Sequence, residues 1–238
     1  MWEYQLFLMP LDIKNDAIFI ADAHYNSQRI SFENLINDIL CDKIQTSQII
    51  FMGDMFDYLS NEVDYFKNIN KHIIEKINTL SIKKQIIYLE GNHDYNLKEL
   101  FPFLKSIPRI NQPLHAKYKE KKIMLSHGDI FTPFFYNLYT NFIRNKYILR
   151  FINSIDINNF ITKKIEKSLK TKDICNKFKN FEQFALKRIE LYKNYKYEFD
   201  IIIEGHFHQG KIYKNYVNVP SYACKNIYFY LEDIIPQH

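Results

Sequence analysis

Short apolar runs that end directly at residues of the metal-binding type constrain the fold of this chain most strongly. In the clearest case, residues 48–52 (QIIFM) combine β-branched, aromatic and other apolar side chains, which predicts a buried strand. Gly53 follows and allows a sharp turn, so Asp54 lies just beyond the carboxyl end of that strand. Ligands of open α/β sheets bind at this edge. A carboxylate has two oxygens, so Asp54 is able to face two cations at once.

The same arrangement recurs along the chain, with helical patterns between the strands. Further apolar strands are predicted at 17–21, 85–89, 122–125 and 200–204. They lead into Asp22-Ala23-His24, Gly91-Asn92-His93-Asp94, Ser126-His127-Gly128-Asp129 and Gly205-His206-Phe207-His208. Amphipathic periodicity predicts helices at 31–40 and 62–80. Strands that alternate with helices in this way predict an α/β sandwich.

One segment differs in composition from the rest of the chain. Residues 130–198 carry 14 lysines and arginines against 6 acidic residues, whereas the whole chain of 238 residues has a net charge of +5. The remainder is therefore net negative. The same segment is rich in aromatic residues and looks helical from 158 to 195. We predict a core formed by residues 1–129 and 199–238, into which residues 130–198 are inserted as a helical cap.

Cysteine usage and hydropathy bear on the compartment of the protein. Cys41, Cys175 and Cys224 are odd in number and form no CxxC pair, which favours unpaired thiols in a reducing cytosol. No apolar stretch approaches the roughly 20 residues that a membrane span requires. The first residues lack the basic region and the cleavage site of a signal peptide. We therefore expect a protein that is soluble or lies on a membrane surface.

The side chains at the five strand ends offer oxygen and nitrogen donors, which suit Mn²⁺, Mg²⁺, Fe²⁺ or Zn²⁺. Two such ions about 3.5–4 Å apart clamp a phosphoryl group and activate a water molecule. Seven side chains are enough for two ions if Asp54 bridges them. We assign one ion to Asp22, His24, Asp54 and His208, and the other to Asp54, Asn92, His127 and His206, with Mn²⁺ as the expected metal.

Four further residues of these motifs stand outside the ligand set. His93 follows Asn92 and is expected to face the substrate, where it would donate to a phosphate oxygen or protonate the leaving group. Asp94 would orient the ring of His93, which makes both residues candidates for catalysis. Asp57 and Asp129 are either outer partners of the ligands or simple turn residues.

The chain resembles the calcineurin-like metallophosphoesterase superfamily through five short motifs that occur in the expected order. They are D-x-H (22–24), G-D-x-x-D (53–57), G-N-H-D (91–94), H-G-D (127–129) and G-H-x-H (205–208). The resemblance covers residues 17–129 and 200–232. It implies a four-layer α/β sandwich with a dinuclear metal centre, in agreement with the ligand set assigned above.

Within that superfamily the chain is most similar to bacterial UDP-2,3-diacylglucosamine hydrolases, in the form found in ε-proteobacteria. These enzymes of the lipid A pathway have a helical insertion between H-G-D and G-H-x-H that covers the acyl chains. The better-known form carries arginine at the position of His93 and leucine at that of Ala23. The resemblance implies cleavage of UDP-2,3-diacylglucosamine to UMP and 2,3-diacylglucosamine 1-phosphate.

The aromatic and basic cap suits a lipid-linked nucleotide on physical grounds. Its aromatic side chains would bury acyl chains at roughly 0.8 kcal/mol per CH₂ group. Arg144, Lys146 and Arg150 are the cations nearest the aromatic run, and one of them is expected to touch a phosphate. The opposite interpretation is equally open: the aromatic residues form an ordinary helical core, and the lysines form a solvated face.

Two other functions stay open from the sequence. A general phosphodiesterase acting on nucleotides or nucleic acid would use the same centre, but lysine and aromatic content alone does not identify a nucleic-acid groove. A non-catalytic binding scaffold would have lost ligands, whereas all seven are present. We expect a cytoplasmic monomer, peripherally associated with the inner membrane, with nucleic acid disfavoured as a partner.

Overall fold

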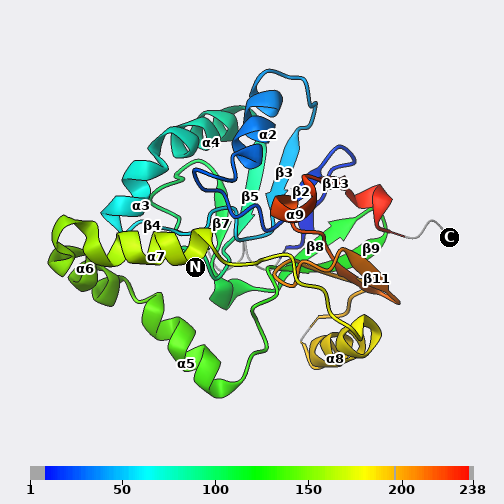
Figure 1. Cartoon of the computed structure of the whole chain (residues 1–238). Helices are drawn as coiled ribbons and strands as arrows, with labels where there is room; N and C mark the ends of the chain where they lie inside the picture. Colours follow the sequence, from blue (N-terminus) through cyan, green and yellow to red (C-terminus); the bar gives the residue numbers. More distant parts are fainter. Residues whose placement is uncertain (1–8, 196, 236–238) are drawn as a thin grey trace.

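The computed structural model describes residues 9–195 and 197–235, in which two β-sheets stack with helices on their outer faces (Figure 1). The five-stranded sheet has the order β13 (Phe229–Tyr230), β2 (Ile18–Ile20), β3 (Gln48–Phe51), β5 (Gln85–Leu89) and β7 (Lys105–Ile107). The six-stranded sheet has the order β1 (Leu11–Asp12), β8 (Leu114–Tyr118), β9 (Lys121–Ser126), β10 (Ile201–Glu204), β12 (Tyr216–Asn218) and β11 (Lys211–Tyr213). A separate short pair joins β4 (Leu59–Ser60) and β6 (Asp94–Tyr95).

The helices follow the predicted alternation in the first half of the chain. In chain order they are α2 (Ser31–Leu40), α3 (Asp64–Ile69), α4 (Lys71–Lys83), α5 (Phe134–Ile143), α6 (Lys146–Ile155), α7 (Phe160–Lys170), α8 (Phe181–Lys193) and α9 (Tyr222–Lys225). The helix predicted at 62–80 is divided at Asn70 into α3 and α4.

Parallel pairing brings the carboxyl ends of the motif-bearing strands to the same level. In the five-stranded sheet Ile18 pairs with Ile49 and Ile49 pairs with Ile86, so β2, β3 and β5 end together. In the other sheet β9 and β10 are also parallel, with Ile123 opposite Ile201. The loops that follow these five strands therefore emerge at corresponding edges of the two sheets.

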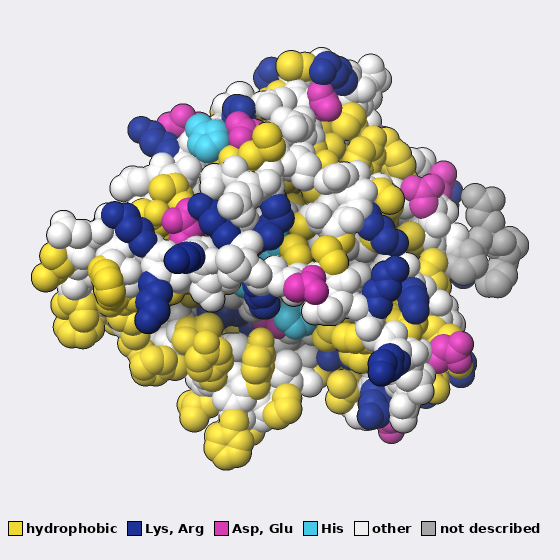
Figure 2. Space-filling view, viewed as in Figure 1, with side chains coloured by type: hydrophobic (Ala, Val, Ile, Leu, Met, Phe, Trp, Pro, Cys, Tyr) yellow, Lys and Arg dark blue, Asp and Glu magenta, His cyan; other side chains and the backbone are white. Residues whose placement is uncertain are grey.

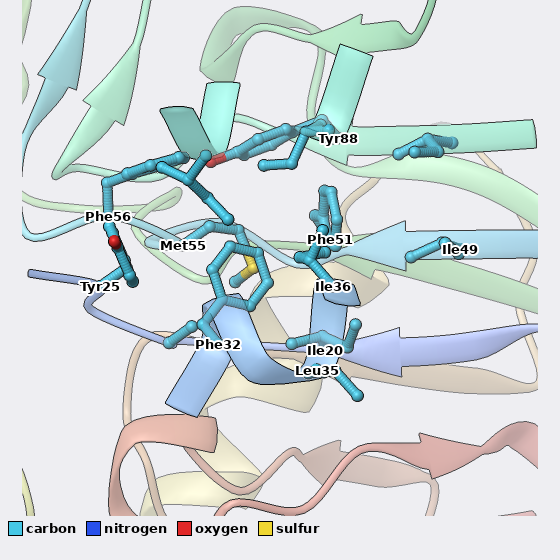
Figure 3. Packing of buried hydrophobic residues seen from close by; sticks show 14 of the residues in the cluster. Ile20, Tyr25, Phe32, Leu35, Ile36, Ile49, Phe51, Met55, Phe56 and Tyr88 are labelled. Carbon is cyan, nitrogen blue, oxygen red and sulfur yellow. The ribbon is translucent and has the colours of Figure 1, made fainter. Parts of the chain in front are cut away.

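Alternation along each strand divides the core into layers, because successive side chains point to opposite faces of a sheet. Ile49 and Phe51 of β3 pack against α2 and α4, as Figure 3 shows for Phe51 beside Ile36 of α2. Ile50, between them, faces the other sheet and belongs to the cluster that includes Leu125 of β9. The order helices–sheet–sheet–helix confirms the predicted four-layer α/β sandwich.

Helix α8 forms the fourth layer, which corrects the predicted extent of the cap. Its residues Ala185 and Ile189 are buried against Met124 of β9 and Ile202 of β10, on the outer face of the six-stranded sheet. The boundaries 130–198 are therefore too wide, because α8 is part of the sandwich. Its lysines and aromatic residues resemble those of the preceding helices, so composition did not separate them.

The segment that stands apart comprises α5, α6 and α7, which we call the cap. It projects to one side of the sandwich, away from α8 (Figure 1). Leu149 of α6 packs with Val63, Phe66 and Tyr95 of the core. Polar contacts reinforce this seam, since the Tyr65 hydroxyl donates to a Glu166 carboxylate oxygen at 2.6 Å.

Candidate metal centre

The loops after five strands bring all seven predicted ligands together at one edge of the sandwich. Asp22 and His24 follow β2, Asp54 follows β3, Asn92 follows β5, His127 follows β9, and His206 and His208 follow β10. Five of the seven, namely Asp22, His24, Asp54, His206 and His208, have φ angles between +44° and +63°. Such angles are uncommon for residues other than glycine, and backbone strain of this kind clusters at functional sites.

The first group of donors consists of Asp22, His24 and His208. The Nε2 atom of His208 lies 3.1 Å from Oδ1 of Asp22 and 3.4 Å from Nε2 of His24. Asp22 and His24 are almost completely buried. These three side chains, together with Asp54, are the ones assigned to the first ion.

The second group consists of Asp54, His127 and His206, with Asn92 beside it. The Nε2 atom of His127 lies 3.4 Å from Oδ2 of Asp54, 3.2 Å from Nδ1 of His206 and 3.2 Å from Oδ1 of Asn92. Asp54 also shares a group with His24 and His93. It is therefore placed between the two groups, where a carboxylate is able to bridge two ions.

The orientation of the imidazoles fits metal ions at both groups. His127 donates its Nδ1 proton to the Met52 carbonyl oxygen at 2.9 Å, and His208 donates its Nδ1 proton to the Ile174 carbonyl oxygen. The Nε2 atoms of these rings therefore point into the site, toward the other donor nitrogens and carboxylate oxygens. A cation between them satisfies these donors, and outer partners of this kind orient metal-binding histidines.

Charged and titratable groups at the site shift one another's pKa values. Burial opposes ionisation of Asp54, but the imidazoles of His127 and His93 outweigh it and hold the pKa of Asp54 well below its usual range. Burial likewise disfavours a charged His127, yet Asp54 raises the pKa of His127 to about 10. Burial and the charge of His127 lower the pKa of His206 to about 4. The bridging carboxylate is thus ionised, as a ligand of cations must be.

Asp57 has the geometry of an outer partner of a ligand. Its Oδ1 atom lies 3.4 Å from Nδ1 of His24, and Arg29 donates to both of its oxygens at 2.6 and 2.5 Å. Asp129 is different, because Arg109 and Arg144 flank its buried carboxylate at 3.2 and 2.7 Å. Arg29 was not singled out in the sequence, since nothing in its neighbourhood marks it as a partner of Asp57.

Asp94 does not orient His93, so that prediction is wrong. Its buried carboxylate accepts hydrogen bonds from the backbone N–H groups of Asp54, Met55 and Gly91 at 2.9, 2.6 and 2.9 Å, and from the Tyr88 hydroxyl at 2.5 Å. Burial and the charge of Asp54 raise the pKa of Asp94 to about 7. Asp94 therefore holds the turn that presents Asp54.

His93 is oriented by the backbone instead. Its Nδ1 proton goes to the Asp57 carbonyl oxygen at 2.6 Å, and its own backbone N–H donates to Oδ1 of Asp54 at 2.8 Å. Burial lowers the pKa of His93. The ring lines a cavity of about 210 Å³ together with ligands of both groups, so it faces the space where a substrate would bind.

The three cap cations, one of which is predicted to touch a phosphate, lie outside this cavity lining. Arg144 donates to the Gly91 carbonyl oxygen at 2.8 Å and to Asp129 at 2.7 Å, and is therefore a link between two motif loops. Arg150 is paired with Glu62 at 3.9 Å. Lys146 is exposed, with its ammonium 5.5 Å from the Tyr147 ring centre.

Two glycines allow the motif loops to approach each other. A Cβ atom on Gly91 would lie 2.1 Å from Oδ1 of Asp54, and one on Gly53 would lie 2.4 Å from Nδ1 of His127. Gly53 also has a φ of +92°, a conformation that side chains disfavour. The glycines of these motifs are thus needed for the close packing of the ligands.

The cysteines differ from the expectation of three unpaired thiols. Cys175 and Cys224 form a disulfide bond, while Cys41 is free and exposed. Their separation of 49 residues carries no local signal of pairing. The bond ties residues 171–180, which we call the strap, to α9. Ile174 and Phe178 of the strap line the same cavity as the metal-ligand side chains.

Within the described parts of the chain, no helix combines the length and the apolar composition needed to cross a bilayer. The cap helices α5, α6 and α7 have 10, 10 and 11 residues.

Several known proteins are similar to this chain. The chain is 25% identical over 114 residues to proteins named UDP-2,3-diacylglucosamine hydrolase from strains of Coxiella burnetii, covering 48% of this chain and 46% of theirs, so it spans about half the length of those relatives. Among solved structures, a protein of unknown function from Aquifex aeolicus is 15% identical, with a TM-score of 0.42 and coverage of 88% and 91%. An E. coli phosphoesterase is 15% identical, with a TM-score of 0.33 and coverage of 49% and 59%.

The family described as calcineurin-like phosphoesterase matches residues 17–210, a range that contains the ends of the five strands that precede the candidate ligands. The match includes all seven candidate ligands as well as the cap and the strap. The chain belongs to the calcineurin-like phosphoesterase family.

Proposed function

We propose that the protein hydrolyses the pyrophosphate bond of UDP-2,3-diacylglucosamine and releases UMP and 2,3-diacylglucosamine 1-phosphate. The observation that carries this proposal is an apolar cavity of about 320 Å³ between the cap and the core. It is lined by residues that include Val63, Phe142, Ile148, Ile161 and Ile165. Two other lining residues, Tyr58 and Tyr95, directly follow Asp57 and Asp94 in the chain, so the wall of the cavity continues from two of the motif loops.

An apolar cavity next to a phosphate-cleaving centre suits a substrate with acyl chains beside its phosphates. Burying such chains contributes about 0.8 kcal/mol per CH₂ group, whereas a simple nucleotide has no acyl chain to place against this surface. The name of the Coxiella burnetii relatives points to the same substrate. Of the two interpretations of the aromatic residues in the cap, a binding site for acyl chains and an ordinary helical core, we therefore favour the binding site.

The chemistry follows from the positions of the ligands and of His93. When bound, two divalent cations neutralise the phosphate charge and lower the pKa of an attacking water molecule. We expect Mn²⁺, and Mg²⁺, Fe²⁺ or Zn²⁺ have compatible ligand preferences. Burial favours the neutral form of the His93 ring, and an anionic phosphate beside Nε2 would favour the protonated form. The ring then donates to a phosphate oxygen or protonates the leaving group.

A turnover assay tests the substrate. We expect Mn²⁺-dependent release of UMP from UDP-2,3-diacylglucosamine in detergent, much faster than cleavage of bis(p-nitrophenyl) phosphate. Ile165 of α7 lines the apolar cavity, so Ile165→Asn should raise KM for the lipid about tenfold, equivalent to about 1.4 kcal/mol, and leave the diester rate unchanged. Lys164→Gln, at the exposed neighbouring position, serves as the matched control.

Two results would contradict this proposal. Metal-dependent cleavage of the diester without turnover of the lipid would support the metal centre but exclude the lipid substrate. The protein would then be a general phosphodiesterase. Equal effects of Ile165→Asn on both substrates would show that the cavity does not bind acyl chains.

We further propose that the cap contacts the surface of the inner membrane, with the protein as a cytoplasmic monomer. Large apolar side chains gather over α5, α6 and α7, and lysines and arginines lie close to them (Figure 2). The most exposed are Phe134 (74%), Phe135 (81%), Tyr147 (70%), Phe151 (65%), Ile157 (77%) and Phe160 (75%). Exposed apolar patches of this kind mark interaction sites, and basic residues beside them favour anionic lipids.

Vesicle binding tests the membrane contact. The double variant Phe134→Ser/Phe135→Ser should reduce co-sedimentation with phosphatidylglycerol-containing vesicles about tenfold, because two exposed rings no longer enter the interface. The pair Ile82→Ser/Ile110→Ser removes equally exposed apolar side chains elsewhere, at 70% and 89% exposure, and should have no effect. Equal losses in the two double variants would exclude the cap as the contact surface.

A further inference from the structure

We propose that the Cys175–Cys224 disulfide positions the ligands of the first metal site, and that its reduction weakens the binding of the ion held there. This inference rests on the metal chemistry of the proposed function, but not on the lipid substrate. The first metal site consists of Asp22, His24 and His208, with Asp54 shared. The disulfide joins the strap, which contacts His208, to α9, which contacts the backbone of Asp22.

The strap holds His208. The carbonyl oxygen of Ile174, one residue before Cys175, accepts the Nδ1 proton of His208. This hydrogen bond directs Nε2 of the same ring toward Oδ1 of Asp22, at 3.1 Å. Because such outer partners fix both the tautomer and the orientation of a metal-binding histidine, displacing Ile174 would disturb the ligand itself.

Helix α9 and the residue before it hold Asp22. The Ser221 hydroxyl and the Ala223 backbone N–H donate to the Asp22 carbonyl oxygen at 2.8 and 3.1 Å, and Tyr222 N–H donates to the carbonyl oxygen of Ala21 at 2.8 Å. Cys224 is the next residue of this helix. The disulfide therefore connects the segment that hydrogen-bonds to His208 with the helix that hydrogen-bonds to the backbone of Asp22.

Other hydrogen bonds hold the two ends of the strap. At its start, the Lys172 backbone N–H donates to the Leu169 carbonyl oxygen of α7 at 3.2 Å. Gln209 accepts a hydrogen bond from the Phe178 backbone N–H at 2.7 Å and donates to the Asn176 carbonyl oxygen at 3.1 Å. Residues 171–180 contain no helix or strand, and each is exposed or half-buried. Opening the disulfide would thus free the stretch around Ile174, while residues 176–178 stay attached.

The redox step needs only a dithiol reductant. One of its thiolates attacks one sulfur of the Cys175–Cys224 bond, which breaks that bond, releases the other cysteine as a thiolate and forms a mixed disulfide. The second thiolate of the reductant then attacks the reductant's own sulfur in the mixed disulfide and releases the remaining cysteine. Two electrons and two protons pass to the protein, which gains two thiols, while the reductant becomes a disulfide. Cys175 is exposed and open to this attack. Disulfides in reducing compartments are usually transient or redox-sensing, which fits a protein on the cytoplasmic side of a membrane.

Mn²⁺ binding measured by electron paramagnetic resonance tests the inference without any substrate. Three forms are titrated: the oxidised chain, the chain reduced by a dithiol that is then removed anaerobically, and Cys175→Ser/Cys224→Ser. We expect two binding constants in the oxidised chain. In the other two forms one constant should weaken about tenfold, in line with the loss of an outer partner, and the other should change less than twofold. Cys41→Ser, which alters the free and exposed cysteine, should match the oxidised chain.

Thiol counting and thermal melting complete the test. The oxidised chain should show one reactive thiol after denaturation, and the reduced chain three; three in both would overturn the proposal. A lower melting temperature on reduction with both Mn²⁺ constants unchanged would also overturn it, since the bond would then be structural only. Absence of Mn²⁺ binding in every form would overturn the metal chemistry of the proposed function together with this inference.

Discussion

Replacing Asp54 by asparagine is expected to disrupt both metal sites and to lower hydrolysis of any phosphodiester substrate by more than about a hundredfold. Removal of an outer partner of a metal ligand already costs about 10- to 100-fold, and Asp54 is placed between both groups of donors. Asparagine tolerates the φ of +55° at this position and keeps a carbonyl oxygen for the His93 N–H, so the fold is expected to persist.

Metal content and rate together decide the outcome. Mass spectrometry of the purified protein should find two Mn²⁺ ions per chain in the parent and at most one in Asp54→Asn. Asp38→Ala removes a half-exposed carboxylate of α2 that pairs with Lys43, and should keep both ions and the full rate. A variant that retains two ions and normal turnover would exclude the bridging role of Asp54.

Replacing Arg188 by methionine is expected to lower the free energy of unfolding by about 3–5 kcal/mol, because it leaves a buried carboxylate without its cation. Arg188 of α8 donates to Glu204 at 2.8 Å, and both side chains are buried. The guanidinium also donates to the carbonyl oxygens of Ile130 and Gly128 at 3.1 and 3.3 Å. The network therefore ties α8 to the loop after His127 and to the strand before His206.

Urea unfolding followed by circular dichroism measures this change. Lys187→Met, at the exposed preceding position of the same helix, should stay within about 0.5 kcal/mol of the parent, as surface substitutions usually do. Hydroxyl groups of Ser126, Tyr192 and Tyr216 still donate to Glu204 in the variant, at 3.0, 2.7 and 2.8 Å. A loss below about 1 kcal/mol would mean that these three donors suffice for the buried charge.

The framework and the ligand set could be predicted because both are written locally in the chain. A run such as Ile49–Met52 is too apolar to be left in water and too short for a helix, so it predicts a buried strand. Parallel strands then place their following residues at a common edge, and the residue types at Asp22, Asp54 and His127 supply the chemistry. The structure brings these side chains within hydrogen-bonding distance or close to it.

Other features of the protein depend on contacts between segments that are distant in the sequence, and only the tertiary structure decided them. The helical pattern of residues 181–193 predicts a helix, but not that it covers the six-stranded sheet rather than the substrate. Asp94 is adjacent to His93, yet it bonds to the turn at Asp54. Cys175 meets Cys224 because the strap crosses the ligand loops. Periodicity and residue type describe which side chains must be buried or charged, whereas the identity of their partners is fixed only when the chain packs.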